Sequence, residues 1–297
     1  MDAQLTVLSY GAGQDSWTLL LKLALEAEFR ETYAPNDLVV VCSDTGNEHP
    51  ETYEHIEFTK FFCEYYGIEF VHLTAAMGYH TEAWIGLEQF YASKNAIGSK
   101  AYPKTCTDNL KIQPIYKWLN QYVNDKYFVL EDLTQRKQAL YRFTAIFGKI
   151  NVLVGIAKGE ERRIAKGETG TKWMDQNIER SYPLIDIGYD RQACQDYINE
   201  TGLPLPPPSN CIFCPFKDEV EILWTARTYP QQFEQWVVLE ANKLAANTHK
   251  GKDNHAVFRN RTLPQVVADA EVKYAHMTEE EIEEYRFSHG HCVASAY

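Results

Sequence analysis

The 297-residue chain lacks any stretch that approaches the roughly 20 consecutive apolar residues of a membrane span. Its first residues, MDAQLTVLSY, lack a basic region and begin at once with a strand-like run, so we expect no signal peptide and a cytoplasmic protein. The chain also lacks internal repeats and low-complexity tracts. These absences favour a globular protein with no membrane partner.

Basic residues are fewer than acidic residues. Lys and Arg number 29 against 41 Asp and Glu, which gives a formal charge of −12. That balance disfavours a protein that coats nucleic acid by charge alone, because such binding rests on many contacts between basic side chains and phosphates. A local basic groove stays compatible with it, and the charge suits an enzyme that docks on other proteins.

Evidence for a disulfide framework is absent as well, because an odd number of cysteines stands in an apparently cytosolic chain. The seven cysteines are Cys42, Cys63, Cys106, Cys194, Cys211, Cys214 and Cys292. Cys42, Cys63 and Cys194 lie in apolar or helical patterns and are predicted to be small core residues.

Short β-rich runs alternate with helical patterns, which predicts an α/β fold with βαβ units and a five-stranded parallel sheet flanked by helices. The predicted strands are residues 5–9, 38–43, 69–73, 152–156 and, as the candidate fifth, 181–185. Helices are predicted over 15–30, 50–66 and 190–201, with a helical insertion at about 81–147.

A proline-rich stretch marks the predicted domain boundary. Pro204, Pro206, Pro207 and Pro208 forbid regular helix. We therefore expect a nucleotide-binding α/β domain over residues 1–203. A smaller helical region with a Cys-x-x-Cys pair would follow over 204–297.

A glycine-containing segment lies between the first predicted strand and helix: Ser9-Tyr10-Gly11-Ala12-Gly13-Gln14-Asp15-Ser16. Glycines let the backbone approach an anion closely, and the amides and dipole of the helix N-terminus favour phosphate. Asp15 or Ser16 can cap the helix, and serine hydroxyls can donate to phosphate oxygens. The segment is neither a Walker A loop nor a dinucleotide loop, since no Gly-Lys-Ser/Thr ends it and Ser16 stands at the third glycine position. The alternative is a structural turn.

The segment resembles the Ser-Gly-Gly-x-Asp-Ser loop of the N-type ATP pyrophosphatases, and about residues 5–217 look like their phosphoadenosine-phosphosulfate (PAPS) reductase-like branch. The further segments that carry the resemblance, in order, are Ser43-Asp44-Thr-Gly-Asn-Glu-His-Pro-Glu-Thr52, Gly155-Ile-Ala-Lys-Gly-Glu-Glu-Arg162-Arg163, and Tyr182-Pro-Leu-Ile-Asp186 followed by Cys211-Ile-Phe-Cys214-Pro215. The resemblance implies a Rossmann-like (adenine nucleotide alpha hydrolase-like) fold. It also implies ATP and Mg²⁺ as ligands, cleavage of ATP to AMP and pyrophosphate, and a catalytic role for Asp15.

Two loop residues depart from that family pattern. Gly11 stands where the family has serine, so Ser9 would supply the hydroxyl. Gln14 stands at a usually basic position, and the side chains that would replace its charge are Lys158, Arg162, Arg163 and Lys166.

Polar residues that follow other predicted strands complete the candidate nucleotide site. Asp44 follows the second strand, where it would hold Mg²⁺ or a nucleotide hydroxyl, or serve only as a turn acid. Gly155 lies near the end of the fourth predicted strand and begins the segment 155–163. Arg162 and Arg163 follow that strand, and at least one is predicted to stabilise charge on the α-phosphate and pyrophosphate. The alternative for the pair is a solvated face.

Cys106, Cys211 and Cys214 occupy positions that resemble three ligands of the iron–sulfur type of this branch, with Thr107 in place of a second adjacent cysteine. The resemblance implies a [4Fe–4S] cluster whose fourth ligand is Cys292, a histidine or an exchangeable group. Zinc with His289 or His291, a persulfide carried by Cys106, and a merely structural pair are the alternatives.

Chains of this look include the ATP-pyrophosphatase components of bacterial DNA phosphorothioation systems of the Dnd and Ssp kind. That resemblance implies a cysteine desulfurase as sulfur donor and DNA-modification proteins as partners. It also implies that DNA is contacted through the complex with these partners. The alternatives are a sulfonucleotide reductase, a non-catalytic nucleotide-binding docking subunit, and other ATP-dependent thiolation such as that of tRNA.

Overall fold

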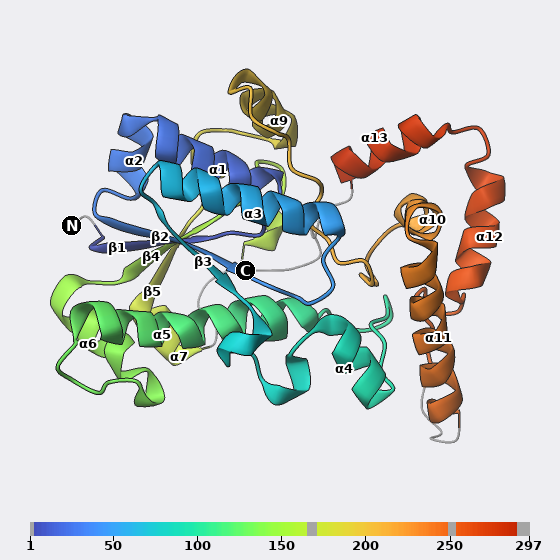
Figure 1. The fold of residues 1–297 in the computed structure, drawn as a ribbon, viewed down its shortest axis with the longest axis horizontal. Helices are drawn as coiled ribbons and strands as arrows, with labels where there is room; N and C mark the ends of the chain where they lie inside the picture. The colour runs from blue at the N-terminus through green and yellow to red at the C-terminus, as the bar shows by residue number, and fades with distance from the viewer. Residues whose placement is uncertain (1–2, 165–170, 249–253, 290–297) are drawn as a thin grey trace.

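The computed structural model describes residues 3–164, 171–248 and 254–289. A five-stranded, all-parallel sheet with the order β3-β2-β1-β4-β5 forms its centre (Figure 1). The strands are β1 Leu5–Ser9, β2 Asp37–Ser43, β3 Glu69–Leu73, β4 Ile150–Val154 and β5 Ile178–Ser181. β2 and β3 lie on one side of β1, whereas β4 and β5 lie on its other side. The carboxyl ends of β1 and β4 therefore meet at the switch point where open α/β sheets bind ligands.

The predicted five-stranded parallel sheet is confirmed, but the predicted position of its fifth strand was wrong. β5 precedes the expected run and reads IERS, with only Ile178 buried. Because β5 is an edge strand, it lacks the continuous apolar run that marks β2, whose last six residues are buried. After Ser181 the chain turns into α8, Pro183–Asp186, where Pro183 stands in the first turn with its φ already suited to a helix.

Two layers of helices cover the sheet (Figure 1). One layer contains α1 Gln14–Leu25, α2 Ala27–Tyr33, α3 Pro50–Tyr65 and α9 Arg191–Glu200, and the other contains α5 Gln113–Tyr127, α6 Gln138–Phe147 and α7 Lys172–Asn177. Trp17, Ile56 and Ile198 pack in the first core. Leu119 and Phe143 pack in the second. The site described below lies at the strand ends between these layers.

The helix predicted over 15–30 is interrupted at Glu26, which has extended backbone angles (φ −115°, ψ 104°) between α1 and α2. The Glu26 carboxylate accepts a hydrogen bond from Lys22 at 2.9 Å. Neither proline nor glycine marks the break, so helical periodicity did not reveal it. The predicted insertion at 81–147 contains α4 Leu87–Lys94, a π-helical turn Asp108–Ile112, α5 and α6. Short 3₁₀ turns are Ala75–Met77, Glu82–Trp84, Gln135–Lys137 and Glu161–Arg163.

The C-terminal helices lie beside the sheet rather than on its faces (Figure 1). They are α10 Glu219–Thr228, α11 Pro230–Asn247, α12 Leu263–Lys273 and α13 Glu279–His289. α4 shares a core with them, in which Leu87 and Tyr91 lie with Phe213 and Trp236. None of the described helices combines the length and the apolar character that crossing a membrane requires.

Candidate functional site

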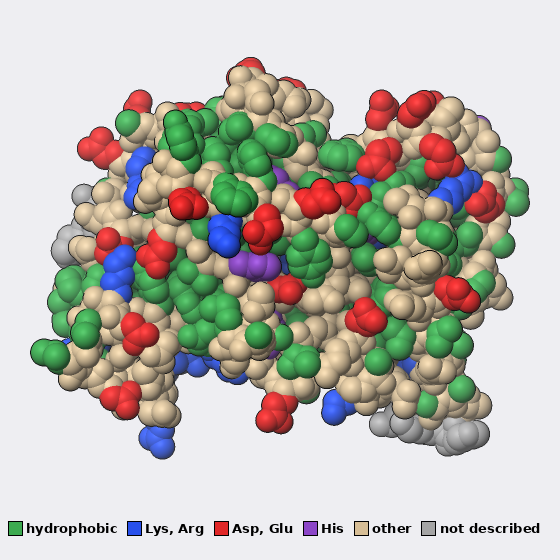
Figure 2. Space-filling view, viewed as in Figure 1, with side chains coloured by type: hydrophobic (Ala, Val, Ile, Leu, Met, Phe, Trp, Pro, Cys, Tyr) green, Lys and Arg blue, Asp and Glu red, His purple; other side chains and the backbone are tan. Residues whose placement is uncertain are grey.

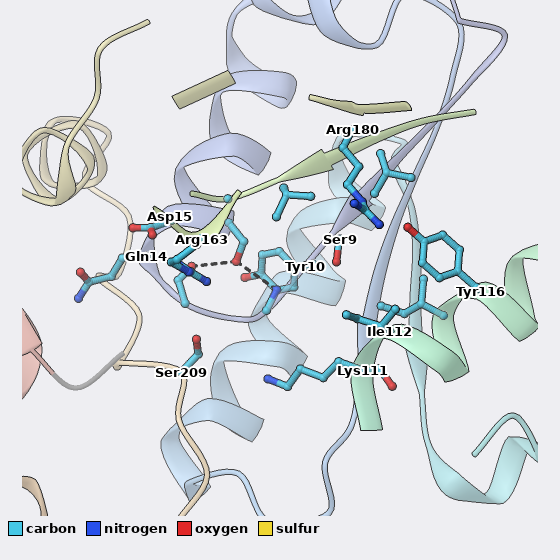
Figure 3. A pocket seen from close by; sticks show the side chains of 18 of the residues that line it. Ser9, Tyr10, Gln14, Asp15, Lys111, Ile112, Tyr116, Arg163, Arg180 and Ser209 are labelled. Atoms are coloured by element: carbon cyan, nitrogen blue, oxygen red, sulfur yellow. Dashed lines mark hydrogen bonds between the residues drawn. The ribbon is translucent and has the colours of Figure 1, made fainter. Parts of the chain in front are cut away.

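A pocket opens where β1, β2 and β4 end (Figure 3). The predicted residues that line it are Ser9, Tyr10, Gly11, Gly13, Gln14, Asp15, Ser16, Gly155 and Arg163. The loop and the segment after β4, separated by about 140 residues of sequence, thus meet at one site, as the parallel pairing of β1 with β4 requires.

The turn between β1 and α1 has the shape of an anion cradle. Ala12 adopts a positive φ of 56°, and Gly13 is the N-cap of α1. The Ser16 hydroxyl donates to the Gly13 carbonyl at 3.0 Å and accepts from the Gly11 amide at 3.2 Å, which fixes the turn. The start of α1, where the first amides of a helix lack intrahelical partners, therefore lies at the pocket.

Gly155 supports this turn from β4. A Cβ at Gly155 would lie 2.9 Å from the Ser16 amide nitrogen and 3.1 Å from the Asp15 carbonyl carbon. Only a residue without a side chain lets the β4 segment approach the start of α1 this closely, which is the physical reason for glycine here.

Four cationic side chains line the pocket of this otherwise acidic chain: Lys111, Arg163, Arg180 and Arg191. Acidic side chains are spread over the outer face that Figure 2 shows. Sequence reasoning placed only Arg163 among the phosphate-binding candidates. Concentrated positive charge inside a pocket of an acidic molecule indicates an anionic ligand.

Glu160 holds two of these arginines together. Its Oε2 lies 2.5 Å from Arg163 Nη1, and its Oε1 bonds Arg191 Nη2. Burial raises the pKa of Glu160, but Arg191 and Arg163 outweigh that effect and lower it below its usual value. An ionised Glu160 therefore fixes guanidinium groups that come from two different elements, the turn after β4 and the start of α9.

Asp15 belongs to the same charge cluster. Arg191 Nη1 lies 3.5 Å from its Oδ1, which accepts no hydrogen bond within the described residues. Burial raises the pKa of Asp15 to about 6, although Arg191 favours the charged form. A buried carboxylate oxygen without a hydrogen bond beside a phosphate cradle fits a role as a Mg²⁺ ligand.

The other end of the pocket is apolar. Ile115 and Val152 line it together with Tyr116, which lies near Arg180 (Figure 3). Burial raises the pKa of Tyr116, while Arg180 acts in the opposite direction. The cationic end of the pocket suits a negatively charged group, and the apolar end with Tyr116 suits a flat ring system. The pocket as a whole therefore fits a ligand that carries both.

The described residues that were predicted for the nucleotide site but do not line the pocket are Ala12, Asp44, Lys158 and Arg162. Lys158 is exposed, and Lys166 lies outside the described residues. Ala12 shapes the turn through its backbone, and Arg162 is exposed. The Asp44 carboxylate accepts hydrogen bonds from the Gly46 amide and the Tyr53 hydroxyl, both at 2.8 Å. This arrangement is that of a turn acid, and the nucleotide or Mg²⁺ role of Asp44 stays a prediction.

Arg180, Arg191 and Ser209 line the pocket but were not identified from the sequence. Arg191 follows Asp190, whose side chain caps α9 by accepting from the Ala193 amide at 2.9 Å. The cap and the predicted helix 190–201 place this arginine at a helix start. Only the packing of α9 against α1 reveals that this start faces the loop.

A second, smaller cavity adjoins the first. Cys106, Cys211 and Cys214 line it, so the three predicted thiols do come together. The Cys211 Sγ lies 3.3 Å from Thr45 Oγ1 and 4.0 Å from Glu48 Oε1. Burial, followed by the nearby Glu48 carboxylate, raises the pKa of Cys211 well above its usual value. Lys111 and Ser209 line both cavities and form their common wall.

The thiol cavity does not have the form of a cluster site here. Its volume of about 20 Å³ holds about one water molecule, far less than four irons and four sulfides need. Within the described ranges, no group of three or more His, Cys, Asp and Glu side chains has the arrangement of metal ligands. His289 is exposed on α13, where its ring stacks on Tyr285. Cys292 and His291 lie outside the described residues, and the cluster stays a prediction.

No protein-family model matches the chain, and no curated protein matches it. Among solved structures, the U34-tRNA thiolase NcsA from Methanococcus maripaludis with its [4Fe-4S] cluster is similar at a TM-score of 0.42 and 12% sequence identity. The match covers 94% of this chain and 75% of that chain. A likeness this distant carries no argument about function.

Proposed function

We propose that this chain is an N-type ATP pyrophosphatase of the PAPS reductase-like branch, which transfers the adenylyl group of ATP to an acceptor oxygen and releases pyrophosphate. One observation carries the proposal. The loop at the start of α1 faces Arg163 and Arg191, and Glu160 holds both arginines in place. A glycine loop alone binds any phosphate, whereas fixed guanidinium groups opposite it suit a reaction in which phosphate charge shifts.

In the proposed reaction, the amides at the start of α1 hold the phosphate chain. An acceptor oxygen forms a bond to the α-phosphorus, and the bond from that phosphorus to pyrophosphate breaks. Arg163 and Arg191 stabilise the charge that builds on the α-phosphate and the leaving pyrophosphate. Asp15 would hold Mg²⁺, which neutralises the triphosphate when bound.

We place the adenine at the apolar end of the pocket. Ile115 and Val152 supply apolar surface there, and Tyr116 adds an aromatic ring. Such side chains contribute binding through the burial of the base, with orientation set by a few polar groups.

The acceptor and the sulfur step form the finer part of the proposal. We propose a nucleic-acid acceptor, namely a DNA phosphate oxygen, with sulfur from a cysteine desulfurase. After adenylation, the outer sulfur of the desulfurase persulfide would attack the acceptor phosphorus and displace AMP. A thiol reductant would then cleave the remaining S–S bond, which leaves the phosphorothioate and a free thiol. The order of the sequence segments and the thiol cavity behind Lys111 and Ser209 support this assignment. The net charge of −12 favours delivery of DNA by partner proteins.

The test is product analysis with Mg²⁺-ATP, with and without DNA, a cysteine desulfurase and cysteine. We expect AMP and pyrophosphate in equal amounts and phosphorothioate in the digested DNA. Only ADP and phosphate, or no turnover even with DNA and sulfur donor present, contradicts the proposal. Turnover of PAPS with a thiol reductant assigns the reductase alternative, and sulfur found in tRNA but not in DNA changes the acceptor.

A further inference from the structure

The proline-rich segment after α9 lies directly on the phosphate loop. A Cβ built at Gly13 would lie 2.5 Å from Ser209 Oγ and 3.1 Å from Ser209 Cβ, and a Cβ at Gly11 would lie 4.0 Å from the same oxygen. Gly13 itself has φ −109° and ψ 174°, angles that any residue adopts. The close approach of Ser209, rather than backbone conformation, is therefore what favours glycine at position 13.

Several contacts hold this segment against the loop. Pro206, Pro207 and Pro208 are all buried. Gln14 Nε2 donates to the Pro206 carbonyl at 3.4 Å. Asn210 Nδ2 donates to Glu221 Oε1 at 2.6 Å, and its Oδ1 lies 3.2 Å from His49 Nε2. Ser209 thus stands between two fixed neighbours in a stretch of restricted backbone.

The Ser209 hydroxyl makes no hydrogen bond to the described part of the chain, although its neighbours are well bonded. It is half-buried and lines the same pocket as Asp15 and Arg163 (Figure 3). A hydroxyl donor held at an anion cradle without a protein partner is suited to donate to the anion.

We propose that Ser209 is a phosphate-contacting residue, whose hydroxyl donates to a phosphoryl oxygen of the nucleotide bound on the loop at residues 11–16. This inference rests on the proposed nucleotide site but not on the reaction there. It makes the C-terminal region part of the nucleotide site. Cys211 follows two residues later, so one short segment closes the phosphate end and begins the wall of the thiol cavity.

The first test compares Ser209→Ala with wild-type protein by calorimetric titration with Mg²⁺-ATP and, separately, with inorganic pyrophosphate. Loss of a hydrogen bond to a charged group predicts about tenfold weaker binding of both ligands, or about 1.4 kcal/mol. Ser93→Ala is the matched control, because Ser93 lies exposed on α4 and lines neither cavity. Binding that is unchanged or tighter in Ser209→Ala overturns the inference, as does a wild-type chain that binds neither ligand.

A double variant tests the geometry. Gly13→Ala places a methyl group against Ser209, so we expect a lower melting temperature and weaker ATP binding. Ser209→Gly removes both close atoms, after which the nearest atom is the backbone nitrogen at 3.6 Å. Gly13→Ala with Ser209→Gly should therefore melt like Ser209→Gly alone, and a defect that persists contradicts the placement. A wild-type chain that binds ATP tenfold more tightly than Ser209→Ala but never releases pyrophosphate keeps this inference and overturns the proposed reaction.

Discussion

Arg162 and Arg163 are neighbours of the same chemical type, yet the fold gives them different surroundings. Arg163 is buried, pairs with Glu160 and lines the pocket, whereas Arg162 is exposed. The sequence predicted that at least one of the two arginines contacts phosphate but did not indicate which one. That depends on the orientation of the short 3₁₀ turn that contains them. At the scale of single residues, function here follows from burial and partners rather than from residue type.

Arg163→Ala should reduce the turnover number for ATP by about 10²–10³, the effect typical of removing one preorganised group that stabilises transition-state charge. Arg162→Ala is the matched control and should retain most of the activity. Steady-state pyrophosphate release measures both. Equal losses in the two variants would show that the arginine facing the pocket has no special role.

The proposed role of Asp15 can be tested through stability as well as through activity. Its native pKa of about 6 lies above the unfolded value of about 3.9, so the native state binds more protons in this window and stability falls as pH rises through it. At pH 8, Asp15→Asn should therefore raise the free energy of unfolding by on the order of 2–3 kcal/mol relative to wild type. At pH 4 the two proteins should unfold at similar denaturant concentrations. The same variant should lose nucleotide turnover. A variant less stable than wild type at pH 8 would contradict the raised pKa.

At the scale of elements, the site depends on how closely β4 and α1 approach. Gly155 stands against the backbone of Asp15 and Ser16, where no flexible side chain can move aside. The geometry of the loop is therefore set by the neighbouring strand as well as by its own residues.

Gly155→Ala should destabilise the protein by about 1–3 kcal/mol and weaken ATP binding, because the added methyl group forces β4 and α1 apart. Gly86→Ala provides the control: its Cβ meets nothing nearer than 3.6 Å, and its φ of −176° suits any residue. Chemical denaturation with ATP titration compares the two. A smaller loss of stability in Gly155→Ala than in Gly86→Ala would be incompatible with the close approach.

The elements that sequence patterns located well are those with strong local signals. A run of consecutive residues was enough to predict the central strands β1 and β2, the loop between β1 and α1, and the turn after β4. β5 has a polar edge pattern, and the break at Glu26 carries neither proline nor glycine. Arg180, Arg191 and Ser209 come from distant segments, and nothing local distinguishes them from other arginines and serines. Long-range packing alone selects them.

At the scale of the whole molecule, a buried polar network fastens the C-terminal region to the loop after β2. Lys217 Nζ lies 3.1 Å from His49 Nε2, and it donates to Thr225 Oγ1 at 2.9 Å and to the Ile212 carbonyl at 3.2 Å. Burial lowers the pKa of Lys217 to about 8, partly offset by Glu221. The Asn47 side chain also accepts from the Phe213 amide at 2.7 Å. This network sets the position of Ser209 and the thiols relative to the sheet.

Lys217→Ala should destabilise the protein by about 3–5 kcal/mol, because it removes a buried charge from its hydrogen-bonded partners and leaves Glu221 without its counter-charge. Lys273→Ala, in the same helical region but on an exposed ion pair with Glu219, should change stability little. Thermal unfolding measures both variants. Comparable melting temperatures for the two would show that the network does not fasten the C-terminal region.

In the proposed reaction, the pocket cleaves the bond between the α- and β-phosphates of ATP. ATP labelled at the α-phosphorus, incubated with Mg²⁺, DNA and sulfur donor, and separated by chromatography, tests it most directly. We expect the label to appear in AMP or in an AMP–acceptor adduct, at a rate that Arg163→Ala lowers by about a hundredfold or more. Label that appears in ADP, or a rate that Arg163→Ala leaves unchanged, would contradict it.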